Sequence, residues 1–127
     1  MVCGDAAAPG GTARWIARPQ DGLARRTAAC LYAALVADAA LDLIGARTTL
    51  LIDGRFAAAE VFVGALAALR TETRVLVADG ASDVPFGALR LIDPALVPEA
   101  ELRQVVPLAG NLAAYGAGWR SALETSV

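Results

Sequence analysis

Residues 48–69, TTLLIDGRFAAAEVFVGALAAL, decide how this chain folds. The run begins with a Leu-Leu-Ile segment typical of a buried strand, and Gly54 then permits a tight turn. Residues 56–69 are predicted to form a helix that runs back across a sheet. Such a strand-turn-helix places backbone N–H groups and the positive end of a helix dipole at the carboxyl edge of the sheet, where open α/β folds bind ligands. The stretch therefore predicts half of a nucleotide-type site.

A second short apolar run, RVLVA at residues 74–78, follows this helix. Strand, helix and strand at this spacing predict a right-handed βαβ unit with two parallel strands, packed by long helices, and hence an α/β fold. The continuous apolar run at residues 50–52 predicts that the first strand is buried on both faces. Two strands are too few for an independent sheet, so we expect the chain to borrow strands from elsewhere.

Upstream, residues 23–44 are predicted to form a helix that is apolar around most of its circumference and is therefore sandwiched between other elements. Asp38 and Asp42 lie four residues apart and share one of its faces, as an acid–base pair or a cation site would require. The alternative, which we favour, is a solvated stripe that pairs with Arg47. Residues 1–22, rich in Gly, Ala and Pro, are expected to be a flexible segment ahead of one α/β unit at residues 23–127.

Downstream, residues 79–84 are predicted to form a turn that leads into a helix with Pro85 in its first turn. Residues 93–107 are interrupted by prolines, and we expect one helical turn near residues 99–104. From residue 108, apolar side chains at helical spacing predict a final helix that docks onto the rest of the domain.

Composition excludes several classes of function. The chain has 127 residues and is 57% hydrophobic, but charged residues interrupt each apolar run, and its start lacks a signal-peptide pattern, so we expect a cytoplasmic protein without a membrane span. The net charge is −2 and the arginines are scattered, which argues against nucleic acid as a partner. The absence of His and Lys removes Ser/His and Cys/His nucleophile pairs, imidazole ligands and a phosphate-loop lysine, and no catalytic or metal-binding residue is predicted.

The predicted site comprises the residues that follow the two strands. Because the carboxyl ends of parallel strands meet at one edge, these residues are expected to form one ledge. Arg55 would pair with a phosphate or stack on a base, and Gly54 would allow close approach of the backbone. The alternative is an ordinary tight turn with Arg55 in solvent. The ledge residues are Asp53, Gly54, Arg55 and Phe56 after the first strand, and Ser82 and Asp83 after the second.

Several motifs support a family resemblance. They are LDLIGA at residues 41–46, LLIDGRFAAAEVF at 50–62, ALAAL at 65–69 and VPFGALRLI at 84–92. In their order and spacing, residues 25–92 resemble the C-terminal portion of the FGGY carbohydrate kinases, members of the actin-like ATPase superfamily with a ribonuclease H-like fold, and are most similar to fuculokinase-like sugar kinases.

The resemblance implies an adenine-nucleotide site, with ATP as cofactor. Gly54 matches the first of two glycines that meet the adenosine in this family, Arg55 stands where the second is expected, and Ala59 stands where an Asn is common. The family's catalytic, phosphate-binding and sugar-binding segments precede this region. The resemblance thus implies an incomplete catalyst, which would need those segments for sugar and Mg²⁺, and whether the chain alone is an enzyme stays open.

A different class of function is also compatible with the sequence. The same fragment would be a non-catalytic interaction module that associates with itself through the helix at residues 23–44 and the uncovered sheet. Either interpretation predicts a homo-oligomer or a partner chain, since an uncovered edge and face in so hydrophobic a chain are a liability.

Overall fold

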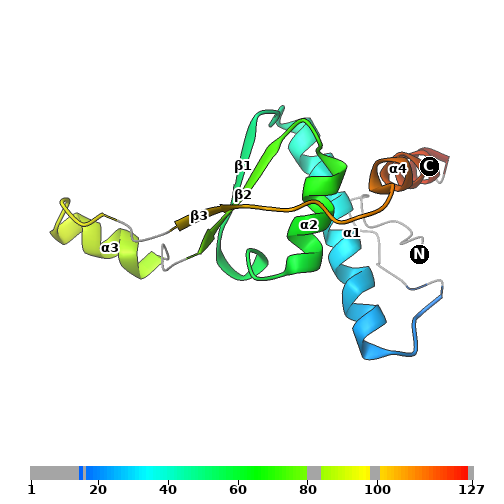
Figure 1. Cartoon of the computed structure of the whole chain (residues 1–127), viewed down its shortest axis with the longest axis horizontal. Coiled ribbons are helices and arrows are strands. Elements are labelled where there is room, and N and C mark those ends of the chain that lie inside the picture. The colour runs from blue at the N-terminus through cyan, green and yellow to red at the C-terminus, as the bar shows by residue number, and fades with distance from the viewer. Residues whose placement is uncertain (1–14, 16, 80–83, 98–100, 126–127) are drawn as a thin grey trace.

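The computed structural model describes residues 15, 17–79, 84–97 and 101–125. They form a small three-stranded sheet with long helices on one side, while a short helix projects away from the opposite end of the molecule (Figure 1). The elements in chain order are α1 (Gly22–Leu43), β1 (Thr49–Ile52), the 3-10 helix η1 (Gly54–Phe56), α2 (Glu60–Leu69), β2 (Arg74–Asp79), α3 (Val84–Ile92), β3 (Glu101–Gln104) and α4 (Leu112–Thr125).

The predicted parallel βαβ unit is confirmed. β1 and β2 pair in parallel, with Leu50 opposite Val75 and Ile52 opposite Val77, and α2 connects them. β2 is the central strand of the order β1-β2-β3. The predicted α/β class therefore holds. The end of α2 at Leu69 and the start of β2 at Arg74 are as predicted, and the other boundaries differ by a few residues at most.

The helical turn predicted near residues 99–104 is wrong. Residues 101–104 form strand β3, which runs antiparallel to β2 with Leu76 opposite Gln104 and Ala78 opposite Leu102. An isolated helical turn would leave one side of β2 with unpaired backbone groups, and those groups are costly to leave without partners. The extended segment satisfies them, which is a tertiary effect that local sequence does not reveal.

The first strand is not buried on both faces as predicted. Its side chains alternate between exposed and half-buried, and Leu51 is 58% exposed. Leu50 and Ile52 pack against the core, but their neighbours point to a face that no described helix covers. The continuous apolar run thus marks a strand that is half-covered within the described part of this chain.

The hydrophobic core lies between the sheet and α2, with α1 packed on the far side of α2 (Figure 1). Val77 of the central strand is fully buried, and Phe62 and Leu66 of α2 pack in the same cluster with Ala34 of α1. Burial of α2 explains its near-continuous apolar sequence, because a helix covered on both sides needs no polar stripe.

Helix α1 begins where the carboxylate of Asp21 accepts a hydrogen bond from the N–H of Ala24 at 2.7 Å, a standard N-cap. Its expected sandwiching is incomplete in the described residues. Leu23 at its start is 72% exposed and Leu43 at its end is 89% exposed. Half-buried Cys30, which has no disulfide, packs against the core.

The final helix, α4, begins at Leu112 rather than at residue 108. The side chain of Asn111 accepts a hydrogen bond from the N–H of Ala114 at 3.1 Å and caps it. Trp119 is buried and meets Tyr32 of α1 edge to face, with ring centroids 6.3 Å apart. The predicted docking of this helix onto the domain is therefore confirmed.

Among the described residues, no helix combines the length and the apolar character that a membrane span requires. The flexible segment predicted at residues 1–22 lies largely outside the described residues, and the described part of it leads into the cap of α1.

Candidate functional site

The predicted ledge residues that follow β1 lie at the carboxyl end of that strand. Asp53 remains extended, with φ −127° and ψ 169°, and its carboxylate accepts a hydrogen bond from the N–H of Gly54 at 2.6 Å. The one-turn helix η1 then reverses the chain toward α2. Ser82 and Asp83, which were predicted to complete the ledge from the end of β2, lie outside the described residues.

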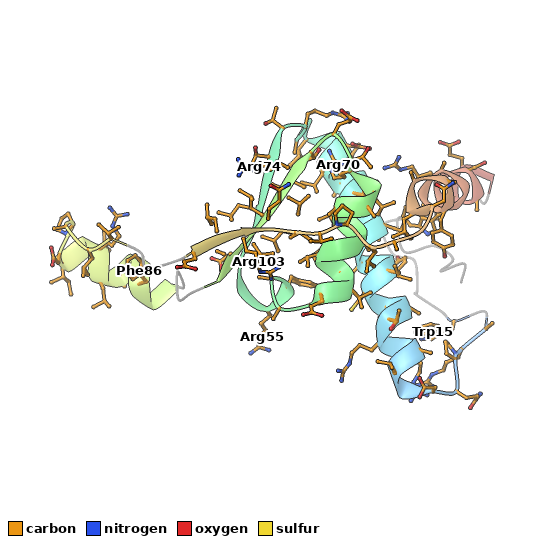
Figure 2. The ribbon with its side chains drawn as sticks, in the orientation of Figure 1. Trp15, Arg55, Arg70, Arg74, Phe86 and Arg103 are labelled. Atoms are coloured by element: carbon orange, nitrogen blue, oxygen red, sulfur yellow. The ribbon has the colours of Figure 1, made fainter. Side chains whose placement is uncertain are left out.

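Gly54 has the positive φ of +70° that the predicted tight turn requires. A Cβ at this position would have no atom within 4 Å, so the turn faces open space. The side chains that follow are also open, because Arg55 is exposed and Phe56 is 57% exposed. Figure 2 shows Arg55 extending away from the ribbon, and the ring of Phe56 is backed by that of Phe62 at a centroid distance of 4.9 Å.

The start of α2 lies next to this turn. The N–H of Val63 already donates to the carbonyl of Ala59 at 3.0 Å, but Ala59 caps the helix without any side-chain hydrogen bond. The first N–H groups of α2 therefore have no capping side chain, and the positive end of the helix dipole lies at this terminus. Glu60 in the first turn is the acidic residue that complements that dipole.

A groove of about 400 Å³ separates the first half of α1 from the start of α2, and Arg55 of the turn forms part of its wall. Its lining is mainly apolar, with two arginines and one carboxylate at the sides. The lining residues are Leu23, Arg26, Thr27, Cys30, Arg55, Ala58, Ala59, Glu60 and Val61. The groove thus combines apolar walls with positive charge, a lining suited to a flat, anionic ligand.

A second polar cluster occupies the opposite end of the strands, and sequence reasoning did not find it. The guanidinium of Arg70, at the end of α2, donates to the carboxylates of Asp38 at 2.8 Å and Asp42 at 3.0 Å. Arg120 of α4 bridges the same two carboxylates, and Arg47 pairs with Asp42 at 3.0 Å. We call these five side chains the arginine–aspartate cluster; it ties α1, α2 and α4 together.

The favoured prediction for Asp38 was wrong. It is only 5% exposed, and Arg70 only 7%, so the pair lies inside the domain rather than on a solvated stripe. The predicted pairing of Asp42 with Arg47 is confirmed. The acid–base or cation-site interpretation also fails to fit, because arginine nitrogens occupy the positions on both carboxylates where a substrate proton or a metal would bind.

Electrostatics agree with this structural role. The hydrogen bond from Arg70 lowers the pKa of Asp42 below its usual value, outweighing partial burial, which acts in the opposite direction. Burial alone would lower the pKa of Arg70, but its hydrogen bonds to Asp38 and Asp42 raise it above the usual value. These groups stay charged at neutral pH and cannot exchange protons with a substrate there.

One sequence signal could have revealed the cluster. Two carboxylates four residues apart on a helix otherwise packed with apolar residues need counter-ions, because a buried charge without a partner is very costly. Arg70 directly follows the apolar helix α2 and is one of the arginines in the predicted βαβ unit. Its distance of 32 residues from Asp38 along the chain hid the pairing.

Comparison with known proteins then identifies relatives of the chain. The family described as carbohydrate kinase FGGY, C-terminal domain, matches residues 1–100. A solved structure, the crystal structure of a carbohydrate kinase from Novosphingobium aromaticivorans, is 54% identical and has a TM-score of 0.77. The match covers 91% of this chain but only 25% of that one, so the chain spans about a quarter of the length of this relative. Comparison with curated proteins finds no match.

Proposed function

Because this chain belongs to the FGGY carbohydrate kinase family, as a C-terminal domain, we propose that it forms the adenine-nucleotide side of an ATP-dependent carbohydrate kinase. The family resemblance predicted from the sequence is confirmed. The proposed whole reaction is transfer of a phosphoryl group from ATP to a sugar hydroxyl. The single observation that carries the nucleotide assignment is the groove at the turn after β1, bordered by Arg55 and the start of α2.

The lining of this groove supports an adenine nucleotide. An adenine ring is flat and largely apolar on its faces, which suits walls made by Ala58, Val61 and the stem of Arg55. The Arg55 guanidinium would stack on the base, while Arg26 from α1 would attract the phosphates. The uncapped start of α2 adds backbone N–H groups for an anion.

Arg55 distinguishes this site from one in which only backbone atoms of two glycines contact the nucleotide. An arginine stands where the family resemblance implies a second glycine, and its side chain is exposed beside the groove. We propose that Arg55 replaces a backbone contact to the nucleotide with a side-chain contact. Gly54 keeps the open, positive-φ turn that lets the ligand approach the strand end.

Catalysis would require more of the kinase than this chain. Phosphoryl transfer depends on loops and a metal that hold the phosphates in line with the acceptor. The carboxylates of Asp38 and Asp42 are neutralised by arginines and lie at the other end of the strands, so they are not candidates for the catalytic base. We propose that the sugar and Mg²⁺ bind only when the preceding part of a kinase is present. A cytoplasmic location remains a prediction from the sequence.

A calorimetric titration of the chain with ATP tests the nucleotide site. Replacing exposed Ala58 by tryptophan (A58W) places an indole ring in the groove. We expect the affinity for ATP to fall at least about tenfold, because the ring would remove part of the contact between the nucleotide and the groove. The matched control is A113W, on an exposed position of α4 away from the groove, which should bind like the unaltered chain. Equal binding by both variants would rule out this groove as the nucleotide site.

The exposed apolar ends of α1 favour the second candidate, a self-associating module without nucleotide chemistry. Leu23 and Leu43 are large side chains left in solvent, and a partner would relieve that exposure. Light scattering across a dilution series, alongside the ATP titration, separates the two functions. A dimer that persists on dilution and binds no ATP would support the module, whereas ATP binding by a monomer would support the kinase domain.

A further inference from the structure

The two sides of the groove beside Arg55 carry different charges. The side made by α1 consists of residues three and four positions apart, which therefore share one face of that helix. These residues are Leu23, Arg26, Thr27 and Cys30. The other side is made by the turn after β1 and the start of α2, where Arg55 and Glu60 are the charged residues. The groove thus has an arginine on each side, and Glu60 adds a carboxylate to the lining.

Glu60 is the first residue of α2, and its side chain is exposed in the groove. In the described part of the chain, no hydrogen bond or ion pair joins its carboxylate to Arg26 or Arg55. An ionised carboxylate accepts hydrogen bonds and donates none. A ligand in the groove would therefore meet Glu60 with a hydrogen-bond donor, and an anionic part of the ligand would be repelled by it.

The chemistry of ATP limits which part of it can meet Glu60. Apart from its phosphates, ATP has donors only in the two ribose hydroxyls and the amino group of adenine. In the proposed binding mode the base stacks on Arg55, and the N–H groups at the start of α2 attract the phosphates. Glu60 belongs to that same first turn, so the part of ATP beside it is the ribose, which joins the base to the phosphates. The amino group is at the far end of the base.

We propose that Glu60 is a specificity-determining residue, whose carboxylate accepts hydrogen bonds from the ribose hydroxyls of ATP. The two oxygens of a carboxylate match two neighbouring hydroxyl donors, and an acidic side chain recognises ribose in the same way in dinucleotide-binding α/β folds. This inference rests on the proposed function, because it uses the proposed nucleotide groove. It makes the groove selective for ribonucleotides over deoxyribonucleotides.

The charge of Glu60 would also fix the direction in which the nucleotide lies. An anion placed directly against this carboxylate is repelled, whereas Arg26 on the α1 side of the groove attracts one. The phosphates would therefore lie on the Arg26 side of the start of α2, and the base would lie against Arg55. Glu60 excludes the reverse orientation, in which the phosphates would occupy the place of the ribose.

Calorimetric titrations with ATP and with 2′-deoxy-ATP test this role. The unaltered chain should bind ATP at least about tenfold more tightly, because 2′-deoxy-ATP lacks one hydrogen bond to a charged group. Glu60→Ala should bring the ratio of the two dissociation constants close to one. Glu60→Gln keeps one acceptor oxygen and should give an intermediate ratio. The ratio is the readout because loss of the negative charge also strengthens the attraction of the phosphates, which both nucleotides share.

Glu124→Ala is the matched control. Glu124 is an exposed carboxylate on α4 that does not line the groove. Its loss changes the net charge of the chain by the same amount as Glu60→Ala, so Glu124→Ala should keep the full preference for ATP. Retention of that preference by Glu60→Ala as well would overturn the proposal, because a residue that only complements the dipole of α2 would not affect the choice between the two sugars.

Inosine triphosphate, which keeps the ribose but lacks the amino group, separates the two kinds of donor. If Glu60→Ala alters the preference for ATP over inosine triphosphate but not over 2′-deoxy-ATP, Glu60 contacts the base and the proposal is wrong. If the unaltered chain binds ATP and 2′-deoxy-ATP equally, this inference fails while the proposed nucleotide site stands. If it binds neither nucleotide, the proposed function fails and this inference fails with it.

Discussion

The two ends of the parallel strands differ in how their charged groups are used. At the amino end, the carboxylates of Asp38 and Asp42 are fully engaged by arginines from other elements. At the carboxyl end, Arg55 extends from a turn into open space beside a groove (Figure 2). Both ends have cavities of similar size, about 410 and 400 Å³. Cavity size therefore does not distinguish the proposed nucleotide site from the structural cluster.

The pairing of the polar groups makes the distinction. In the arginine–aspartate cluster, both carboxylates are bound by arginines from other elements, so neither is left to bind a ligand. Beside the groove, the start of α2 has no side-chain cap and Gly54 exposes backbone. The turn at Gly54 and the start of α2 lie at the carboxyl edge, where open α/β sheets bind their ligands.

The sharpest test of this contrast is to remove Arg70. Arg70→Met leaves the buried carboxylate of Asp38 without its buried counter-ion, and we expect the free energy of unfolding to fall by about 3–5 kcal/mol. Arg47→Met is the control, because the side chain of Arg47 is 67% exposed and its loss should cost less than about 1 kcal/mol. Urea unfolding measures both. Similar small losses would show that the cluster does not hold the helices together.

A smaller effect is expected at the carboxyl end. Gly54→Ala places a side chain at φ +70°, which costs about 1–2 kcal/mol even though no atom would clash with it. Gly118→Ala in α4 is the control, since that position is equally open but lacks a positive φ, and it should be neutral or stabilise by up to about 1 kcal/mol. Thermal unfolding of both variants checks the difference. If Gly54→Ala unfolded thermally like the unaltered chain, the turn would not be held in this conformation.

The smallest predicted effect is on the free energy of unfolding at low pH. The pKa of Asp42 is lower in the folded chain than its ordinary value of 3.8, so its stabilising contribution is present above about pH 4 and is lost as the pH falls through the folded pKa. The free energy of unfolding should therefore decrease below pH 4 more steeply for the unaltered chain than for Asp42→Asn. Denaturant unfolding at several pH values measures the two slopes. Parallel slopes would show that Asp42 is not coupled to Arg70 in solution.

Most of the α/β framework could be predicted because its signals are local. The Leu-Leu-Ile run, Gly54 and the apolar helix that follows each act within a few residues, and together they indicate a parallel βαβ unit. The family resemblance has the same basis, since it rests on contiguous motifs. The turn residues Asp53 to Phe56 were likewise placed correctly at the strand end, while the predicted role in nucleotide binding stays a prediction.

Other features depended on partners far away in the chain. Strand β3 exists because β2 offers an open side, and a helical turn at the same residues was an equally reasonable prediction from local sequence. Leu51 is exposed because no described element packs on it. Its sequence neighbours Leu50 and Ile52 are apolar, as they would be in a strand buried on both faces.

The sequence by itself therefore determined the order of strand, turn and helix and the position of Gly54, because backbone conformation and hydrophobic periodicity are properties of neighbouring residues. Only the tertiary structure decided that Asp38 is buried against Arg70 and Arg120, and that residues 101–104 pair with β2 as a strand. Charge pairing and burial are set by which surfaces meet in space, and residues that meet across 32 or 82 positions of the chain leave no local trace of that meeting.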